Sequence, residues 1–362
     1  LLYNALSGAA AELSPQETNV FQSFQSHKII PYKKMTENLE LVEGLYAHGF
    51  LIEQSLDERE VIAEERNYWR KTRDLIDLTI TPTLACNLNC SYCFQIRYPK
   101  SLTQKTRMAV QKFLTKVITP STQLVLLHWY GGEPTLRLQD IQALTPTVIA
   151  LVNQLGISLE AEILTNAWVL DEAMCRILQR ECHIRTFQVS IDWPRDQFDR
   201  LRGTVGGFDD LLRKLELAVR YFDLKLRVHC HLQNVMQIEE LLHLLHSRGF
   251  SRTMTAWGTR FYVHFSLLYD FSEVCRHVSR IKIPHNDWGE IQGKYLGLAE
   301  DLGFEVNWLP KRVIGKYCSA QSENAFVIGP EGYIFKCYRQ DLANPKEAIG
   351  HVLDPVIPYA VM

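Results

Sequence analysis

The sequence has no strong excess of charge of either sign. Its 39 lysines and arginines stand against 41 aspartates and glutamates, which leaves a formal net charge of −2. This balance argues against general nucleic-acid binding, although it does not exclude a local basic patch. Long apolar runs are also missing, since none reaches the ~18–20 residues that a membrane span needs. A secretory signal peptide is absent too. We therefore expect neither a nucleic-acid partner nor a membrane.

Cysteine, in contrast, is frequent, with nine residues in the chain. An odd number without a secretory signal favours a reducing, cytoplasmic compartment over a disulfide framework. Four of the nine fall inside helix-like or strand-like patterns without mutual motif spacing, which is typical of buried structural thiols: Cys175, Cys182, Cys230 and Cys275. The remaining five need another explanation.

Changes in pattern along the 362 residues indicate three parts. Residues 1–74 form a polar, helix-rich segment, with one helix expected over 35–48, that either docks a peptide or only packs against the next domain. Residues 75–310 alternate strand-like and helix-like segments. Residues 311–362 contain two strand-like runs around Pro330-Glu331-Gly332, which predicts a β-hairpin.

The alternating part predicts an α/β fold. Strands are expected at 75–80, 124–129, 160–164, 185–191, 225–232 and 260–265, and helices at 104–117, 138–155, 171–179, 208–222, 238–247 and 291–301. Repeated βα units imply parallel strands with right-handed crossovers. Six units predict a partial (β/α)6, TIM-like barrel, whose site lies on loops at the carboxyl ends of the strands.

The loop after the first expected strand holds three cysteines in the pattern C-x3-C-x2-C: Cys86, Cys90 and Cys93. Three thiolates cannot complete a structural zinc site, which takes four protein ligands. They suit a cubane iron–sulfur cluster, because its cysteines come in tight local runs. Such a cluster keeps one iron free of protein ligands, and that iron can hold a substrate or cofactor.

The loop after the second expected strand reads Gly131-Gly132-Glu133-Pro134. Two glycines allow the backbone to approach a ligand closely, and a carboxylate with exposed carbonyls suits an ammonium group. Taken alone, the tetrapeptide fits an ordinary Gly-Gly-Pro turn better than a binding loop. Its position one βα unit after the cysteine loop favours the binding interpretation.

These two loops and their separation resemble the radical S-adenosylmethionine (SAM) superfamily. Cys318, thirteen intervening residues, Gly332, four more and Cys337 are similar to the opening of a SPASM domain, which holds auxiliary iron–sulfur clusters. Together they resemble SPASM-containing peptide and protein maturases, such as anaerobic sulfatase-maturing enzymes and modifiers of ribosomal peptides. The likeness covers the chain from about residue 75 onward. It implies a partial barrel with an N-terminal helical segment and a C-terminal SPASM-like hairpin extension.

The resemblance also implies roles for individual residues, carried over by motif position. Cys86, Cys90 and Cys93 would ligate a 4Fe-4S cluster. The aromatic residue after the cysteine loop would lie beside the adenine of SAM, and the Gly-Gly-Glu loop would meet its ammonium group: Phe94, Gly131, Gly132 and Glu133.

Further matches lie later along the barrel. Thr165-Asn166 stands where the family often has Thr-Asn-Gly, but here Ala167 replaces the glycine. Ser190 and Asp192 resemble part of the family's Ser-Ile-Asp-Gly. Ser190 is a candidate ribose contact, and Asp192 is either a SAM contact or a helix cap. Arg202 matches the arginine that meets the SAM carboxylate, although an isolated loop arginine is usually a solvated charge. For His128, a structural role is the expectation.

The SPASM pattern is incomplete. The family continues with further cysteines, whereas this sequence ends at Met362. Cys318 and Cys337 alone cannot complete an auxiliary cubane. Either the natural chain continues and forms auxiliary clusters, which we favour, or these two cysteines are vestigial. The start at Leu1 also indicates a missing N-terminus.

The resemblance implies an enzyme that reductively cleaves SAM to a 5′-deoxyadenosyl radical and modifies a peptide or protein by hydrogen abstraction. Its partners would be that substrate and a one-electron reductant of the flavodoxin or ferredoxin type. Two alternatives stay open: a small-molecule radical SAM enzyme, and a non-catalytic iron–sulfur electron-transfer or partner subunit. The residues that match SAM contacts argue against the second, because a cluster holder needs no SAM pocket.

Overall fold

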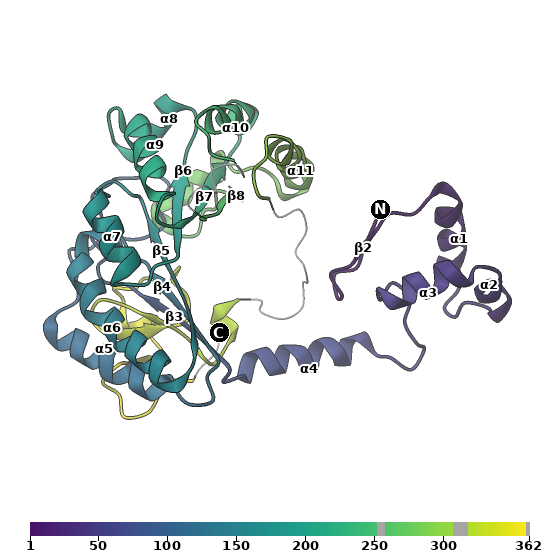
Figure 1. Cartoon of the computed structure of the whole chain (residues 1–362), viewed down its shortest axis with the longest axis horizontal. Coiled ribbons are helices and arrows are strands. Elements are labelled where there is room, and N and C mark those ends of the chain that lie inside the picture. The colour runs from purple at the N-terminus through teal and green to yellow at the C-terminus, as the bar shows by residue number, and fades with distance from the viewer. Residues whose placement is uncertain (252–257, 307–317, 360–362) are drawn as a thin grey trace. The chain divides into compact units, whose positions relative to one another are not determined.

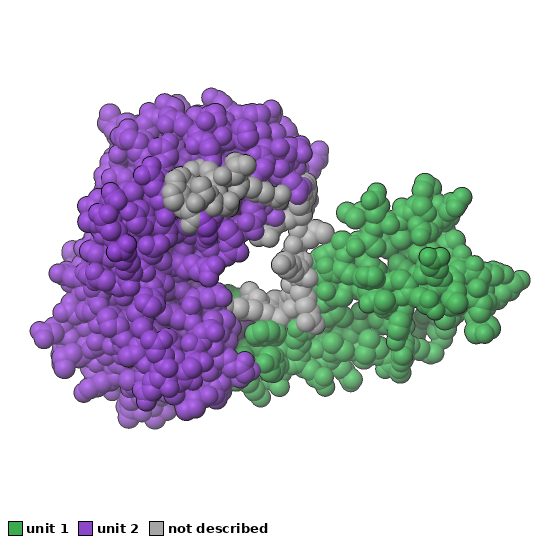
Figure 2. Space-filling view, in the orientation of Figure 1, with its two compact units in different colours: residues 1–72, 309–318 green, residues 73–308, 319–362 purple. Residues whose placement is uncertain are grey.

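The computed structural model describes residues 1–251, 258–306 and 318–359. The chain divides into two compact units (Figures 1 and 2): residues 1–72 with 309–318, and residues 73–308 with 319–362. Within the described ranges, no helix is both long enough and apolar enough to cross a bilayer.

The first unit is a short antiparallel strand pair followed by helices. Its elements are β1 (Leu2–Tyr3), β2 (Ala10–Ala11), α1 (Pro15–Gln25), α2 (Tyr32–Glu37), α3 (Leu39–Ala47) and α4 (Glu58–Lys71). Ser14 and Glu17 form a reciprocal capping box at the start of α1, which satisfies backbone donors that the first turn leaves free. A single helix over 35–48 was the expectation; the chain instead breaks at Asn38, whose φ of −135° is not helical.

The second unit is built on six parallel strands that follow the chain order (Figure 1). They are β3 (Leu75–Ile80), β4 (Leu124–Trp129), β5 (Ser158–Thr165), β6 (Thr186–Ile191), β7 (Asp223–Cys230) and β8 (Phe261–Leu267). The helices between and after them are α5 (Gln104–Val117), α6 (Leu138–Leu155), α7 (Glu172–Arg180), α8 (Arg195–Arg202), α9 (Gly207–Ala218), α10 (Ile238–Ser247) and α11 (His285–Asp301). This arrangement confirms the predicted partial (β/α)6 barrel.

Burial alternates from one residue to the next along the strands β4 and β6 of this sheet. On β4, Val125, Leu127 and Trp129 are fully buried, whereas the residues between them are half-buried. Strand β6 repeats the pattern, with Phe187, Val189 and Ile191 fully buried. The buried set packs against the helices, as expected for strands whose crossovers cover one face. The other face carries polar side chains such as His128, Gln188 and Ser190.

The C-terminal strands continue the same sheet. Strand β9 (Ala325–Ile328) pairs in parallel with β3, and β10 (Tyr333–Phe335) returns antiparallel to β9, which confirms the predicted hairpin. Strand β11 (Gly350–His351) pairs with β10. Gly332 makes the turn with φ +92°, in the region that favours glycine. Among the described residues the sheet has nine strands, in the order β11-β10-β9-β3-β4-β5-β6-β7-β8.

Candidate functional site

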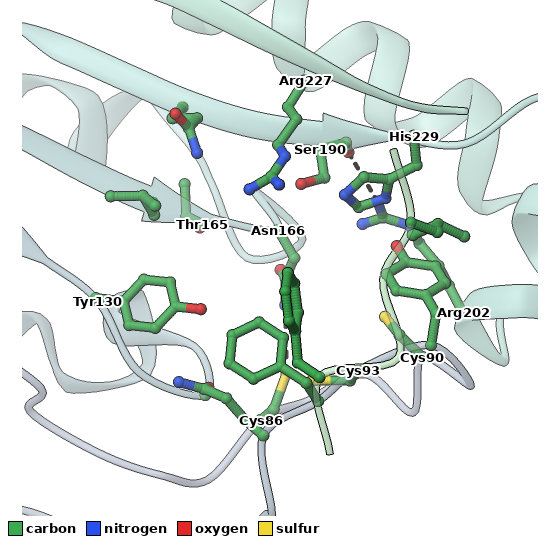
Figure 3. A pocket seen from close by; sticks show the side chains of 18 of the residues that line it. Cys86, Cys90, Cys93, Tyr130, Thr165, Asn166, Ser190, Arg202, Arg227 and His229 are labelled. Atoms are coloured by element: carbon green, nitrogen blue, oxygen red, sulfur yellow. Dashed lines mark hydrogen bonds between the residues drawn. The ribbon is translucent and has the colours of Figure 1, made fainter. Parts of the chain in front are cut away.

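A cavity of about 190 Å³ lies at the carboxyl ends of the parallel strands. Figure 3 shows the side chains that line it. Its lining includes most of the residues that the sequence predicted, namely Cys86, Cys90, Cys93, Phe94, Gly131, Gly132, Thr165, Ser190 and Arg202. Parallel strands bring these distant residues to one edge, because all their carboxyl ends point the same way.

The cysteine loop is held in place by the end of α8. Backbone N–H groups of Asn89 and Ser91 donate to the carbonyl oxygens of Arg202 and Leu201, at 3.2 and 2.8 Å. Burial raises the pKa of all three thiols, that of Cys90 to about 11. The loop therefore presents three neighbouring sulfur atoms to the cavity from a fixed backbone.

The donor set fits an iron–sulfur cluster better than a single metal ion. Within the described part of the chain, no three histidine, cysteine or carboxylate side chains are grouped so that they could hold one ion. A cubane cluster does not need three side chains directed at one ion, since each cysteine binds a different iron. Cys86, Cys90 and Cys93 thus remain the predicted cluster ligands.

Both glycines of the Gly-Gly-Glu loop are required by close packing. A Cβ on Gly131 would lie 2.3 Å from the Thr83 carbonyl oxygen, and one on Gly132 would lie 2.2 Å from that of Ala85. The N–H groups of Gly132 and Glu133 donate to the same two carbonyls, at 3.0 and 2.9 Å. The glycines thus bring this loop against the start of the cysteine loop, while both also line the cavity.

The carboxylate of Glu133 does not line the cavity, although we expected this residue to meet an ammonium group. It is fully buried and accepts hydrogen bonds from Thr135 (backbone and side chain), the Thr165 hydroxyl and the Asn166 backbone, at 2.5–3.0 Å. Burial raises the pKa of Glu133, and these donors oppose that shift. Its carboxylate therefore ties the loop to the end of β5, and a ligand contact is left to the backbone.

The end of β5 adopts a special backbone conformation. Ala167, at the family's glycine position, has φ +60° and is fully buried. That left-handed conformation is the one for which glycine is preferred. The Ala167 N–H donates to the Thr165 hydroxyl at 3.0 Å, and Asn166 Nδ2 lies 3.7 Å from Cys86 Sγ.

Asp192 forms the buried centre of a network beneath the cysteine loop. It accepts hydrogen bonds from Arg202 Nε (2.8 Å), Tyr92 Oη (2.7 Å) and His229 Nδ1 (3.0 Å). Asp192 is fully buried and does not line the cavity, so its predicted SAM contact is replaced by a positioning role. Arg202 also donates from Nη2 to the Ser190 carbonyl at 2.9 Å (Figure 3) and still lines the cavity.

Aromatic rings form another wall of the cavity. Phe94 makes an edge-to-face contact with Phe271, with centroids 5.7 Å apart, and Phe271 stacks on Tyr269 at 5.0 Å. The Ser272 hydroxyl donates to the Phe94 carbonyl at 2.9 Å and fixes the backbone there. Such a wall suits a flat base such as adenine.

The polar lining residues that the sequence analysis did not single out include Gln188, Arg227 and His229. Each lies within a predicted strand, on the side of the alternation that borders the cavity; Gln188 and Arg227 are half-buried, and His229 is buried. That alternation was a usable signal, but it did not show which face of the sheet borders the cavity.

The two C-terminal cysteines fall in different units. Cys318 is exposed and groups with the first unit, whereas Cys337 lies in the second. Their membership of an auxiliary cluster stays a prediction.

Comparison with known proteins identifies the barrel. Residues 80–245 match the model of the Radical SAM superfamily. The chain contains a radical SAM domain. Domains of this superfamily use a 4Fe-4S cluster and SAM, and the cysteine loop is where the cluster ligands of such a domain are expected.

The chain is also similar to individual proteins. It is 29% identical over 175 residues to an Fe-coproporphyrin III synthase of Methanosarcina barkeri, covering 47% of this chain and 41% of the relative. It is 21% identical over 368 aligned positions to the sporulation killing factor maturation protein SkfB of Bacillus subtilis, covering 98% and 81%. The structure of anSMEcpe with bound AdoMet and Cp18Cys peptide superposes with a TM-score of 0.60 at 17% identity, covering 77% and 78%. That likeness concerns the fold. The chain spans less than half the length of the first two curated relatives.

Proposed function

We propose that this protein is a radical SAM enzyme that modifies a peptide or protein. The observation that carries the proposal is the single cavity lined by Cys86, Cys90 and Cys93 together with Ser190 and Arg202. When bound, the cluster and SAM supply a 5′-deoxyadenosyl radical through one-electron cleavage of SAM. The chain itself binds and orients both partners and excludes water.

The lining residues divide this work among themselves. Arg202 offers its remaining N–H groups to the SAM carboxylate, Ser190 lies at the ribose, and the aromatic wall of Phe94 and Phe271 covers the adenine. Backbone groups of Gly131 and Gly132 meet the ammonium group. Holding the reacting atoms in one geometry is the protein's largest contribution, because a radical abstracts the nearest suitable hydrogen.

A peptide substrate is supported by the open barrel and by the relatives. The polar face of the sheet is only half-buried, so an extended chain can reach the cavity from that side. SkfB is a maturation protein, and anSMEcpe binds a peptide beside AdoMet. The M. barkeri synthase, at 29% identity, favours a small-molecule substrate as the second candidate.

The electron comes, in this proposal, from a flavodoxin- or ferredoxin-type reductant in a reducing cytoplasm. All nine cysteines are free thiols, which agrees with that compartment. Auxiliary clusters at Cys318 and Cys337 form part of the proposal only if further cysteines follow.

The decisive experiment measures 5′-deoxyadenosine formed from SAM by the anaerobically reconstituted chain with dithionite. We expect formation by the wild type and none by the triple variant Cys86→Ala, Cys90→Ala, Cys93→Ala. Cys175→Ala is the matched control, because that thiol is buried outside the cavity. A triple variant that still cleaves SAM would refute the proposal. Intact-mass comparison of peptide and metabolite pools after turnover then separates the two substrate classes.

We further propose that the first unit binds an apolar segment of the peptide substrate. A groove of about 680 Å³ lies between α1, α3 and residues 50–54. Large apolar side chains along it are exposed, including Ile29 (56%), Leu39 (54%), Tyr46 (52%) and Ile52 (42%). Exposed apolar grooves of this kind serve as peptide-docking sites.

A further inference from the structure

Among the residues that the structure describes, two arginines and no acidic side chain line the cavity. Arg202 and Arg227 line it, and neither aspartate nor glutamate does. The charge of Arg202 is balanced by its ion pair with Asp192 at 2.8 Å. Among the described residues, no carboxylate forms an ion pair with Arg227. The cavity therefore carries one uncompensated positive charge.

Arg227 points into this cavity from the middle of β7. Its Cα is paired with Ser190 on β6 and with His264 on β8. In Figure 3 its guanidinium lies across the cavity from the three cysteines. Nη2 donates to the Ser266 hydroxyl at 2.7 Å, while Nε is buried without any hydrogen-bond partner. A half-buried guanidinium with one neutral partner and a buried, unpartnered Nε is costly unless a ligand completes its hydrogen bonds.

The surroundings of Arg227 offer donors and no negative charge. Burial lowers the pKa of His264 to about 4 and also lowers that of His229, so both rings are neutral at pH 7. The side-chain nitrogen of Gln95, on the cysteine side, is buried without a partner as well. Unmet N–H groups in one cavity call for a ligand that brings oxygen acceptors.

The function proposed above assigns the SAM carboxylate to Arg202 rather than to Arg227. In this superfamily the carboxylate of SAM chelates the cluster together with its amino group, which keeps the carboxylate on the cysteine side of the cavity. Arg202, whose neighbour Asn89 belongs to the cysteine loop, is placed for that group. Arg227 lies on the opposite side.

We propose that Arg227 anchors a carboxylate of the substrate, so that the molecule modified carries a carboxylate close to the reacting carbon. This inference rests on the function proposed above and adds a substrate feature to it. A guanidinium matches a carboxylate through two parallel hydrogen bonds, which a neutral amide cannot reproduce. The carboxylate comes from an acidic side chain or from a chain terminus, and the two sources share this chemistry.

The test measures binding to the cluster-loaded protein at saturating SAM by calorimetry or saturation-transfer NMR. Three probes are compared: N-acetyl-glutamate N-methylamide, its glutamine isostere, and N-acetyl-glycylglycine, which carries a terminal carboxylate. We expect at least one carboxylate probe to bind about tenfold more tightly than the glutamine probe. The tighter carboxylate probe identifies the source, side chain or terminus.

Variants assign this preference to Arg227. Arg227→Gln should reduce the preference for a carboxylate probe over the glutamine probe to less than about twofold. Arg227→Lys keeps the positive charge but lacks the paired N–H donors of a guanidinium, so it should retain part of that preference. Lys225→Gln is the matched control, because Lys225 lies two residues earlier on β7 and lines a different cavity. It should keep the full preference.

Two results would overturn the inference: equal affinities of the wild type for the three probes, or an about tenfold loss of SAM affinity in Arg227→Gln, which would assign Arg227 to SAM. Binding is measured without turnover, so it stays informative if SAM is not cleaved. Cleavage of SAM without any carboxylate preference would remove this inference alone and leave the proposed function intact.

Discussion

Asp192 illustrates how one buried carboxylate can position a whole loop. Burial by itself would raise its pKa, but the Arg202 guanidinium, with His229 and Tyr92, holds that pKa well below its usual range. Asp192 is therefore an anion, and Arg202 beside it is only 2% exposed. Tyr92 lies between two of the predicted cluster ligands, so the network connects α8 and β7 to the cysteine loop.

We predict that Asp192→Asn destabilises the protein and impairs cluster loading. The amide keeps the shape but leaves the buried Arg202 charge without compensation, which costs about 3–5 kcal/mol. Urea unfolding of the purified protein measures the loss, and iron content after reconstitution measures the effect on the loop. Tyr92→Phe removes one hydrogen bond and should cost about 1 kcal/mol.

Asp209→Asn is the matched control for this prediction. Asp209 pairs with Arg195 at 3.0 Å, but both side chains are about half exposed (46% and 48%). Such exposed pairs contribute about 0–1 kcal/mol. If Asp192→Asn unfolded at the same urea concentration as Asp209→Asn, the network would not have the role assigned to it.

Among the elements of the alternating part, strands and helices were predicted from the sequence about equally well, and helices α5, α6 and α10 begin and end at the predicted residues. Strands β3 and β4 begin and end at the predicted residues, because their buried positions alternate or run on without interruption. Helix α8 was missed, since only Phe198 and Arg202 of its eight residues are buried and no apolar period marks it. The break between α2 and α3 at Asn38 was also missed. It depends on the backbone angle of one residue, and no apolar period in the sequence marks it.

The candidate site was predictable where chemistry depends on residue spacing. Cysteine spacing and the Gly-Gly-Glu loop brought the correct loops together, because parallel strands align their carboxyl ends. Arg227 and His229 were not predictable, because their roles depend on which face of β7 borders the cavity. The hydrogen bonds from Thr165 and Asn166 to Glu133 were not predicted, because they join loops that are far apart in the sequence.

The strands β3, β4 and β5 are linked on the polar face by His128. Its Nε2 lies 3.1 Å from Asp77 Oδ1, and its Nδ1 lies 2.7 Å from Glu162 Oε1. Burial by itself lowers the pKa of His128, but hydrogen bonds to the two carboxylates outweigh burial and raise it to about 9. The side chain does not line the cavity, which agrees with the structural role expected for it.

We predict that the contribution of His128 to stability is lost at alkaline pH. The folded-state pKa is raised above the ordinary 6.5, so this contribution is fully present below about pH 6.5 and disappears as the pH rises through about 9. Its size is at most about 3 kcal/mol. The measurement is the difference in unfolding free energy between wild type and His128→Gln, which cancels the titrating groups that do not contact His128. A difference that stays constant from pH 6 to 10 would contradict this assignment.

At the scale of the whole molecule, one chain combines a reaction cavity in the second unit with an apolar groove in the first. A substrate bound by both is held at a raised effective concentration, because the second contact becomes intramolecular. In the proposed role, the groove binds a part of the substrate that does not react, so it would contribute equally to ground-state and transition-state binding. Its loss should therefore change KM and leave kcat unaltered.

The double variant Leu39→Ser, Ile52→Ser tests whether the groove affects KM and not kcat. Both side chains are exposed in the groove (54% and 42%), so their replacement should leave the fold intact. Burial of each of these apolar side chains under a bound peptide contributes about 1.5–3 kcal/mol to binding. We therefore expect KM of the double variant to rise at least about tenfold. KM is measured for a peptide that the wild type consumes from a randomised pool, detected by intact mass.

Leu353→Ser is the matched control, because Leu353 is an equally exposed leucine of the second unit (57%). This variant should change neither KM nor kcat. An unchanged KM in the double variant would separate the groove from the substrate and favour the small-molecule alternative, because a small molecule held in the cavity has no segment left to dock.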